Sequence, residues 1–209
     1  MAELLWTHPR GKAVGQLLLA HGAGAPMDSA FMEQLTLALA ASGVAVARFE
    51  FDYMAARRVG GAKRPPERAD KLLAQFQAAL AHMPAGPVWI GGKSMGGRMA
   101  TLLAAAAPPR LAGVLCYGYP FHPLGKPEVL RTEHLGTLPV PLLICQGERD
   151  PFGTREQVAD YELPASVELR WLPDGDHDLK PRKASGHTHE GNISAAAQAS
   201  ATWMAASVR

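Results

Sequence analysis

The chain has 209 residues, 47% of them hydrophobic, which suits a single domain spanning residues 1–209 with a sizeable core. Its formal net charge of +2 gives no indication of a nucleic-acid partner. No apolar run approaches the roughly 20 residues that cross a bilayer, so no membrane partner is expected. The first ten residues lack a basic start followed by a long apolar segment, which predicts a cytoplasmic protein without a signal peptide.

Apolar runs and helical patterns alternate along the chain. Strands are expected at 14–20, 44–51, 87–91, 111–117, 140–146 and 167–172. Helices are expected from Asp28 or Ser29 to Gly43, from near Pro66 to Leu80, from Met95 to about Ala107, at 154–161 and at 193–208. A basic loop is expected at 52–66, and a loop with room for one short helix, lining a cleft, at 119–138. This order predicts an α/β fold with a mostly parallel sheet and helices on both faces.

The segment Gly92-Lys93-Ser94-Met95-Gly96 matches Gly-x-Ser-x-Gly and lies between an expected strand and an expected helix. In such a sharp turn the serine hydroxyl stands clear of its surroundings. The two glycines remove side chains that would collide with the neighbouring strand and helix. Ser94 is therefore a candidate nucleophile, although the pattern alone also arises by chance.

A serine hydroxyl needs a base, and the base needs a group that orients it. Asp150 follows the expected strand 140–146, and His177 follows the strand 167–172. Each is the right residue type in the chain order serine, acid, histidine. Taken singly, Asp150 is equally well explained as a turn former and His177 as an exposed loop residue; together with Ser94 they predict a catalytic triad.

Backbone N–H groups are needed to hold the oxyanion that develops during acyl transfer. The Met95 N–H lies at the expected start of a helix and is one candidate. The loop His21-Gly22-Ala23-Gly24 offers the Ala23 N–H as the second, unless it is a plain glycine-rich turn. We interpret His21 as structural.

Three segments resemble known hydrolases. The elbow at 91–98, the segment 119–128 and the segment 175–181 resemble the α/β-hydrolase superfamily, and within it the small lidless enzymes related to dienelactone hydrolase. They are more specifically similar to the KANL/Tex-type hydrolase-like family. The resemblance covers nearly the whole chain and implies a single-domain α/β-hydrolase fold with no cap domain.

The resemblance implies that Ser94 is the nucleophile, Asp150 the orienting acid and His177 the general base. It assigns the oxyanion donors to Ala23 and Met95. Dienelactone hydrolase has cysteine where this chain has Ser94, so the resemblance does not transfer its particular lactone substrate.

Substrate-binding residues are expected in two places. Arg57 and Arg58, in the basic loop, are either solvated or bind a carboxylate or phosphate of the substrate. Tyr119, Phe121 and His122 follow the strand next to that of Ser94 and either line the substrate pocket or pack their loop. We expect no metal, because no ligand cluster accompanies the two histidines at 187 and 189, and no cofactor.

These features predict a serine hydrolase that cleaves small, accessible carboxylic esters through an acyl-enzyme. The same triad also serves thioesterases and peptidases. The competing hypothesis is a hydrolase-like binding or scaffold protein with little turnover. The natural ester and the oligomeric state do not follow from the sequence.

Overall fold

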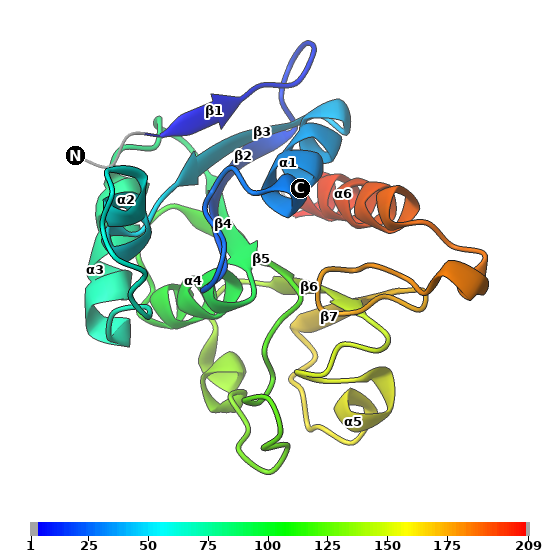
Figure 1. Cartoon of the computed structure of the whole chain (residues 1–209). Coiled ribbons are helices and arrows are strands. Elements are labelled where there is room, and N and C mark those ends of the chain that lie inside the picture. Colours follow the sequence, from blue (N-terminus) through cyan, green and yellow to red (C-terminus); the bar gives the residue numbers. More distant parts are fainter. Residues whose placement is uncertain (1–3, 208–209) are drawn as a thin grey trace.

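A seven-stranded sheet forms the centre of the computed structural model, which describes residues 4–207 (Figure 1). Its strands are β1 (Leu5–Thr7), β2 (Gly15–Ala20), β3 (Val44–Phe49), β4 (Val88–Lys93), β5 (Leu111–Tyr117), β6 (Leu142–Gly147) and β7 (Val167–Leu172). Their order is β1-β3-β2-β4-β5-β6-β7, and only β1 runs antiparallel to its neighbour among these strands. The chain continues from β2 to β3 on one side and then places β4 to β7 on the other side of β2. A crevice for ligands forms at such a switch point.

Helices cover both faces of the sheet (Figure 1). One face carries α1 (Ala30–Ala41) and α6 (His189–Ala206), which also contact one another. The other face carries α3 (Ala69–Ala81) and α4 (Met95–Ala105). Short helices in the connections are α2 (Asp52–Arg58), η1 (Glu133–Thr137), α5 (Arg155–Ala159) and η2 (Lys183–Ser185).

Two hydrophobic cores lie on opposite sides of the sheet. Alternate residues of β2 point to opposite faces, so Leu18 and Ala20 join the core under α3 and α4, whereas Leu17 and Leu19 join the core under α1 and α6. Every residue of β3, β4 and β6 is buried. This burial explains their continuous apolar runs and confirms the predicted single-domain α/β fold.

Three elements differ from the expectation. β1 adds an antiparallel edge strand, three residues long, that the sequence pattern did not reveal. The expected basic loop begins as helix α2, because Tyr53 and Met54 bury their side chains in the core. Helix α6 begins at His189, four residues earlier than expected, since the Thr188 side chain accepts a hydrogen bond from the Gly191 N–H and caps it.

The connection between β5 and β6 contains η1 as its only helix among the described residues, so no cap domain is inserted there. Within residues 4–207, no helix combines the length and the apolar character that crossing a bilayer requires. Within the same residues, no cap domain covers the carboxyl ends of the parallel strands.

Candidate active site

Ser94 occupies the sharp turn between β4 and α4. Its φ of 51° and ψ of −114° lie in a region that residues with a Cβ rarely adopt. The Ser94 N–H donates to the Tyr117 carbonyl of the neighbouring strand at 3.0 Å and anchors the turn. The half-buried Ser94 hydroxyl is thereby presented at the carboxyl end of the sheet.

The glycines on either side of Ser94 allow a close approach of backbones. A Cβ on Gly92 would lie 2.4 Å from the carbonyl carbon of Gly96, and a Cβ on Gly96 would lie 2.6 Å from the carbonyl oxygen of Ala20. Carbon atoms do not approach this closely, so any larger residue would push α4 away from the sheet. The Gly-x-Ser-x-Gly pattern is thus a steric requirement of this turn.

Ser94, His177 and Asp150 form one chain of hydrogen bonds. The Ser94 Oγ lies 2.9 Å from the His177 Nε2, and the His177 Nδ1 lies 2.8 Å from the Asp150 Oδ2. The carboxylate accepts at Nδ1, so that nitrogen carries the proton and Nε2 is free to accept from the serine hydroxyl. Asp150 is fully buried, whereas the His177 side chain is 23% exposed and remains accessible from solvent.

Buried donors hold the Asp150 carboxylate in this orientation. The Phe152 N–H donates to its Oδ1 at 2.9 Å, and the Gln146 amide donates to its Oδ2 at 3.0 Å. Gln146 also accepts from the Tyr119 N–H at 2.7 Å, which fixes the side-chain amide from the other side. Sequence reasoning missed Gln146, although a glutamine at the end of an apolar strand, four residues before Asp150, was a usable signal.

Two clefts meet at Ser94, and Ala23, Ser94 and Phe152 line both. The first, which we call the Phe31 cleft, has a volume of about 520 Å³. Its other lining residues include Gly22, Ala30, Phe31, Met32, Lys93 and His177. The second, which we call the Arg98 cleft, has a volume of about 340 Å³. Its other lining residues include Glu67, Leu72, Met95, Arg98, Met99 and Arg131.

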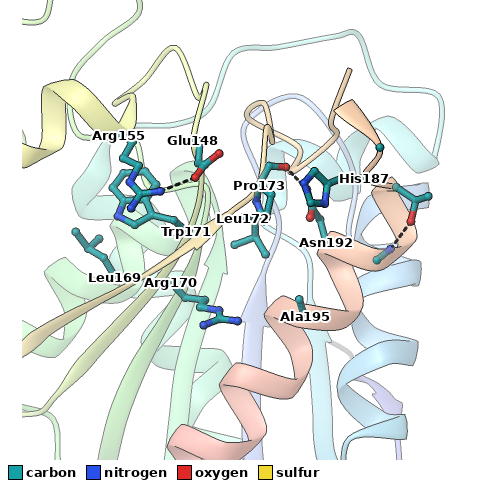
Figure 2. Close-up of a pocket in the computed structure, with 13 residues that line it drawn as sticks. Glu148, Arg155, Leu169, Arg170, Trp171, Leu172, Pro173, His187, Asn192 and Ala195 are labelled. Atoms are coloured by element: carbon teal, nitrogen blue, oxygen red, sulfur yellow. Dashed lines mark hydrogen bonds and ion pairs between the residues drawn. The ribbon is translucent and has the colours of Figure 1, made fainter. Parts of the chain in front are cut away.

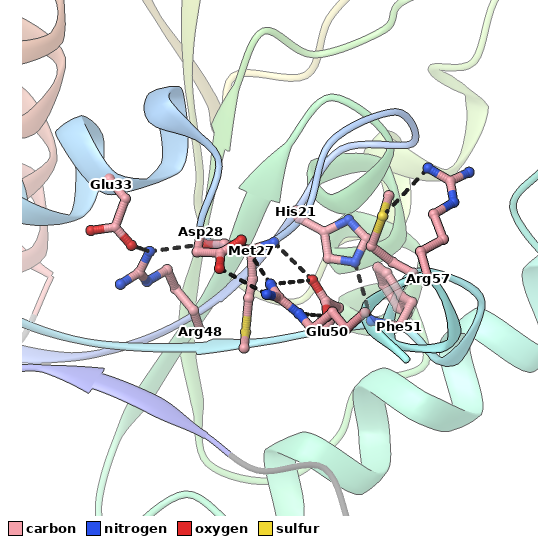
Figure 3. Close-up of polar contacts among 10 residues, drawn as sticks. His21, Met27, Asp28, Glu33, Arg48, Glu50, Phe51 and Arg57 are labelled. Carbon is pink, nitrogen blue, oxygen red and sulfur yellow. Dashed lines mark hydrogen bonds and ion pairs between the residues drawn. The ribbon is translucent and has the colours of Figure 1, made fainter. Parts of the chain in front are cut away.

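The two backbone amides expected to hold an oxyanion lie beside Ser94. Met95 is the first residue of α4, where a helix leaves its N–H groups without intrahelical acceptors. The Ala23 N–H belongs to the same peptide as the Gly22 carbonyl, which lies 2.7 Å from the His21 Nδ1. The His21 Nε2 accepts a hydrogen bond from the Phe51 N–H at 3.1 Å (Figure 3). The His21 Nδ1 therefore carries the proton and donates to the Gly22 carbonyl. His21 therefore orients the peptide that carries the Ala23 N–H.

Lys93 directly precedes Ser94, and its ammonium group is buried. The Nζ atom lies 3.2 Å from the Asp178 Oδ1 and 5.4 Å from the centre of the Phe31 ring. Burial lowers the pKa of Lys93, and the negative charges of Asp178 and Asp150 partly offset this effect. The ion pair joins the turn at Ser94 to the loop that carries His177.

The aromatic residues expected in the substrate pocket lie beneath it. Tyr119, Phe121 and His122 are buried, and they do not line either cleft. The Tyr119 hydroxyl donates to the Arg131 carbonyl at 2.8 Å, and the Phe121 carbonyl accepts from the Arg131 N–H at 2.8 Å. The Tyr119 side chain and the Phe121 backbone therefore support the segment that carries Arg131.

The two arginines expected to bind substrate are not brought to Ser94 either. Arg58 forms a bidentate pair with Asp28, with N–O distances of 2.7 and 2.8 Å, and also contacts Glu50. Arg57 donates to the Arg64 carbonyl at 2.5 Å and lies over the Tyr53 ring. Both guanidinium groups therefore connect α2 to its neighbours and line neither cleft.

A larger hollow of about 710 Å³ lies beside β7 and the start of α6, away from Ser94 (Figure 2). Several of its polar side chains are paired within the protein. Arg155 pairs with Glu148 at 2.6 Å, and the Asn192 amide donates to the Pro173 carbonyl at 3.0 Å. Ser94, Asp150 and His177 do not line this hollow.

No group of three or more His, Cys, Asp or Glu side chains that could hold a metal ion occurs in the described part of the chain. His189, one of the two histidines considered as metal ligands, hydrogen-bonds through its Nε2 to the Asp178 carbonyl at 2.8 Å. His189 is the first residue of α6, so this part of the sequence begins a helix.

Comparison with known proteins agrees with this fold. Residues 13–205 match the model of a family described as the alpha/beta hydrolase domain. The chain belongs to this family. It is also similar in structure to an alpha-beta serine hydrolase homologue from Coxiella burnetii, with a TM-score of 0.70, 19% identity and coverage of 100% of this chain and 92% of the other.

Two further solved structures share the fold of this α/β hydrolase. The esterase domain of a Rhodothermus marinus protein has a TM-score of 0.66 and 19% identity over 97% of this chain and 92% of the other. Dienelactone hydrolase from Anabaena variabilis has a TM-score of 0.67 and 22% identity over 95% of this chain and 88% of the other. The family match confirms the predicted superfamily. A dienelactone hydrolase is among its structural neighbours, as expected.

Proposed function

We propose that this α/β hydrolase is a serine hydrolase of carboxylic esters. His177 takes the proton of Ser94 as the hydroxyl oxygen attacks the ester carbonyl. The N–H groups of Ala23 and Met95 hold the oxyanion of the tetrahedral intermediate. His177 then gives its proton to the leaving alcohol, and an acyl-enzyme remains. Water, activated by His177, releases the acid and restores Ser94.

The observation that carries this proposal is the continuous chain of hydrogen bonds from the Ser94 Oγ through His177 to the buried Asp150 carboxylate. A nucleophile, a base and an orienting acid within hydrogen-bond reach are the parts that acyl transfer requires. The two clefts that meet at Ser94 offer separate places for the acyl and the alcohol portions of an ester. The similarity to an esterase domain favours esters over thioesters and peptides.

Replacing the nucleophile tests the proposal. Ser94→Ala removes the attacking oxygen, so kcat for short acyl esters should fall by a factor of up to about 10⁶. A fluorophosphonate probe should label the wild-type protein at Ser94 and leave the variant unlabelled. Circular dichroism of both proteins controls for folding.

Turnover near the wild-type level in Ser94→Ala would refute the assignment of the nucleophile. A folded wild-type protein that neither reacts with the probe nor cleaves any ester would instead favour the binding or scaffold protein. Parallel assays with thioesters and peptides of the same acyl groups would identify the bond that the enzyme prefers, because one triad serves all three.

A further inference from the structure

Two arginines, Arg98 and Arg131, line the Arg98 cleft. Among the ion pairs of residues 4–207, none includes Arg98 or Arg131. The Arg98 Nε is buried and has no hydrogen-bond partner among the described residues. A buried donor in this state is costly to leave unpaired, so the site is short of an acceptor.

The environment of Arg131 supports the same interpretation. Burial, and then the positive charge of Arg98, lower the pKa of the Arg131 guanidinium. Two like charges within one cleft favour the binding of an anion between them. By contrast, Lys93 and Arg58 are paired with Asp178 and Asp28 respectively.

Both arginines are attached to rigid parts of the fold. Arg98 is one turn of α4 beyond Ser94, and its N–H donates to the Ser94 carbonyl at 3.0 Å. One turn places its Cα about 6 Å along the helix axis from that of Ser94. The backbone of Arg131 is held from both sides by Tyr119 and Phe121. An anion bound between the two side chains therefore lies close to the reacting serine.

Glu67 also lines the Arg98 cleft and is the one carboxylate among its lining residues. It accepts from the Gln75 amide at 2.6 Å and lies 3.9 Å from the Lys71 Nζ. Leu72 and Met99 make the adjoining wall apolar. Glu67 is thus engaged elsewhere, and the positive charge of the two arginines is left for a ligand.

We propose that Arg98 and Arg131 bind a carboxylate of the substrate, so that the preferred esters carry a negative charge a few bonds from the scissile carbonyl. This inference rests on the proposed ester hydrolysis at Ser94. The planar guanidinium groups match the two oxygens of a carboxylate, and the apolar wall strengthens the pairing. The carboxylate is not altered in the reaction: the ester bond breaks at Ser94, and the charged group positions it.

Matched pairs of esters test the inference. Monomethyl glutarate and methyl pentanoate share the number of acyl carbons and differ in the terminal carboxylate. In the second pair, 4-acetoxybutanoate and butyl acetate share the number of carbons in the alcohol portion, and only the former carries a carboxylate there. The readout is the ratio of kcat/KM for the charged and neutral member of each pair, measured by proton release in a pH-stat.

We expect the wild-type ratio to exceed one in at least one pair, which identifies the portion of the ester that enters the Arg98 cleft. Arg98→Gln and Arg131→Gln should each lower that ratio by about tenfold to a hundredfold, the range for a lost hydrogen bond to a charged group. Arg10→Gln is the matched control. Arg10 is exposed and precedes β2, at the opposite end of the sheet from Ser94, so its loss should leave the ratio unchanged.

A ratio below one in both pairs, or a ratio that neither cleft variant changes, would overturn the anion site. Hydrolysis of the neutral esters by the wild type and not by Ser94→Ala would then leave the serine hydrolase intact. If no ester is cleaved and the fluorophosphonate probe does not react, ester hydrolysis itself fails. Calorimetry with glutarate then decides the site by itself: binding that Arg131→Gln abolishes supports it, and no binding refutes it.

Discussion

Single hydrogen bonds determine what each polar side chain of this site can do. His177 presents a free Nε2 to Ser94 because the buried Asp150 carboxylate occupies its Nδ1. That carboxylate in turn depends on Gln146, whose amide also donates to the Tyr119 and Gly153 carbonyls at 3.2 and 3.3 Å. One glutamine thus joins β5, β6 and the turn that carries the acid.

Gln146→Leu should lower kcat by about tenfold to a hundredfold with little change in KM. It removes a hydrogen bond to the Asp150 carboxylate, worth about 1.5–3 kcal/mol, and loosens the alignment of His177. Steady-state kinetics with a neutral ester, well below the melting temperature, measure the effect. The exposed Gln198, on α6, provides the control Gln198→Leu. A kcat within twofold of the wild type in Gln146→Leu would contradict the positioning role.

At the scale of elements, the site depends on how closely α4 lies against the sheet. Gly96 faces the carbonyl oxygens of Ala20 and His21, at the point where β2 passes into the loop that carries Ala23. The start of α4 and this loop together enclose the proposed oxyanion position. A small displacement of α4 relative to this loop therefore changes the positions of the Met95 and Ala23 N–H groups relative to Ser94.

Gly96→Ala should lower the free energy of unfolding by about 2–3 kcal/mol and greatly reduce esterase activity. Its new Cβ would lie 2.6 Å from two backbone oxygens, which cannot move aside as a side chain can. Urea unfolding and ester assays of the same preparations measure the two effects. Gly136→Ala is the control, because a Cβ there meets no atom within 4 Å. Equal effects of the two substitutions would show that α4 tolerates more space than we infer.

For the whole molecule, burial of titratable groups couples stability to pH. Burial lowers the pKa of His21 from its ordinary value of 6.5. Burial, and then the charge of Arg98, lower the pKa of His134 as well. Both side chains are therefore neutral in the folded protein at a pH where the unfolded chain already binds protons.

The free energy of unfolding should consequently decrease as the pH falls below about 6.5, before any carboxylate is protonated. Arg58 and Arg182 lower the pKa of Asp28 and Asp174 respectively, so the stabilisation from these carboxylates is lost only at a lower pH. Urea unfolding at a series of pH values between about 8 and 5 measures the first decrease. His134→Gln should flatten it, whereas replacement of the exposed His82 should not. A stability that rises on acidification through this range would contradict the prediction.

The sequence by itself determined the alternation of strands and helices, the elbow at Ser94 and the order of the serine, acid and histidine. These features are local, because each depends on a short stretch of sequence. They are the periodicity of apolar residues, the need for glycine in a tight turn, and the position of a residue just after a strand. Because parallel strands end at one edge of a sheet, the order of the elements also predicted that these three side chains meet.

Only the tertiary structure decided which partner each long polar side chain has. Arg57 and Arg58, after β3, were expected either in solvent or at the substrate, but Arg58 pairs with Asp28, thirty positions away in sequence. Arg98 and Arg131 line the cleft beside Ser94 instead, and neither occurs in an ion pair of the described residues. Such partners depend on how helices and loops pack across the sheet, and the periodicity and spacing of residues do not predict that packing. The same physical reason explains why Gln146 became visible as the support of Asp150 only in three dimensions.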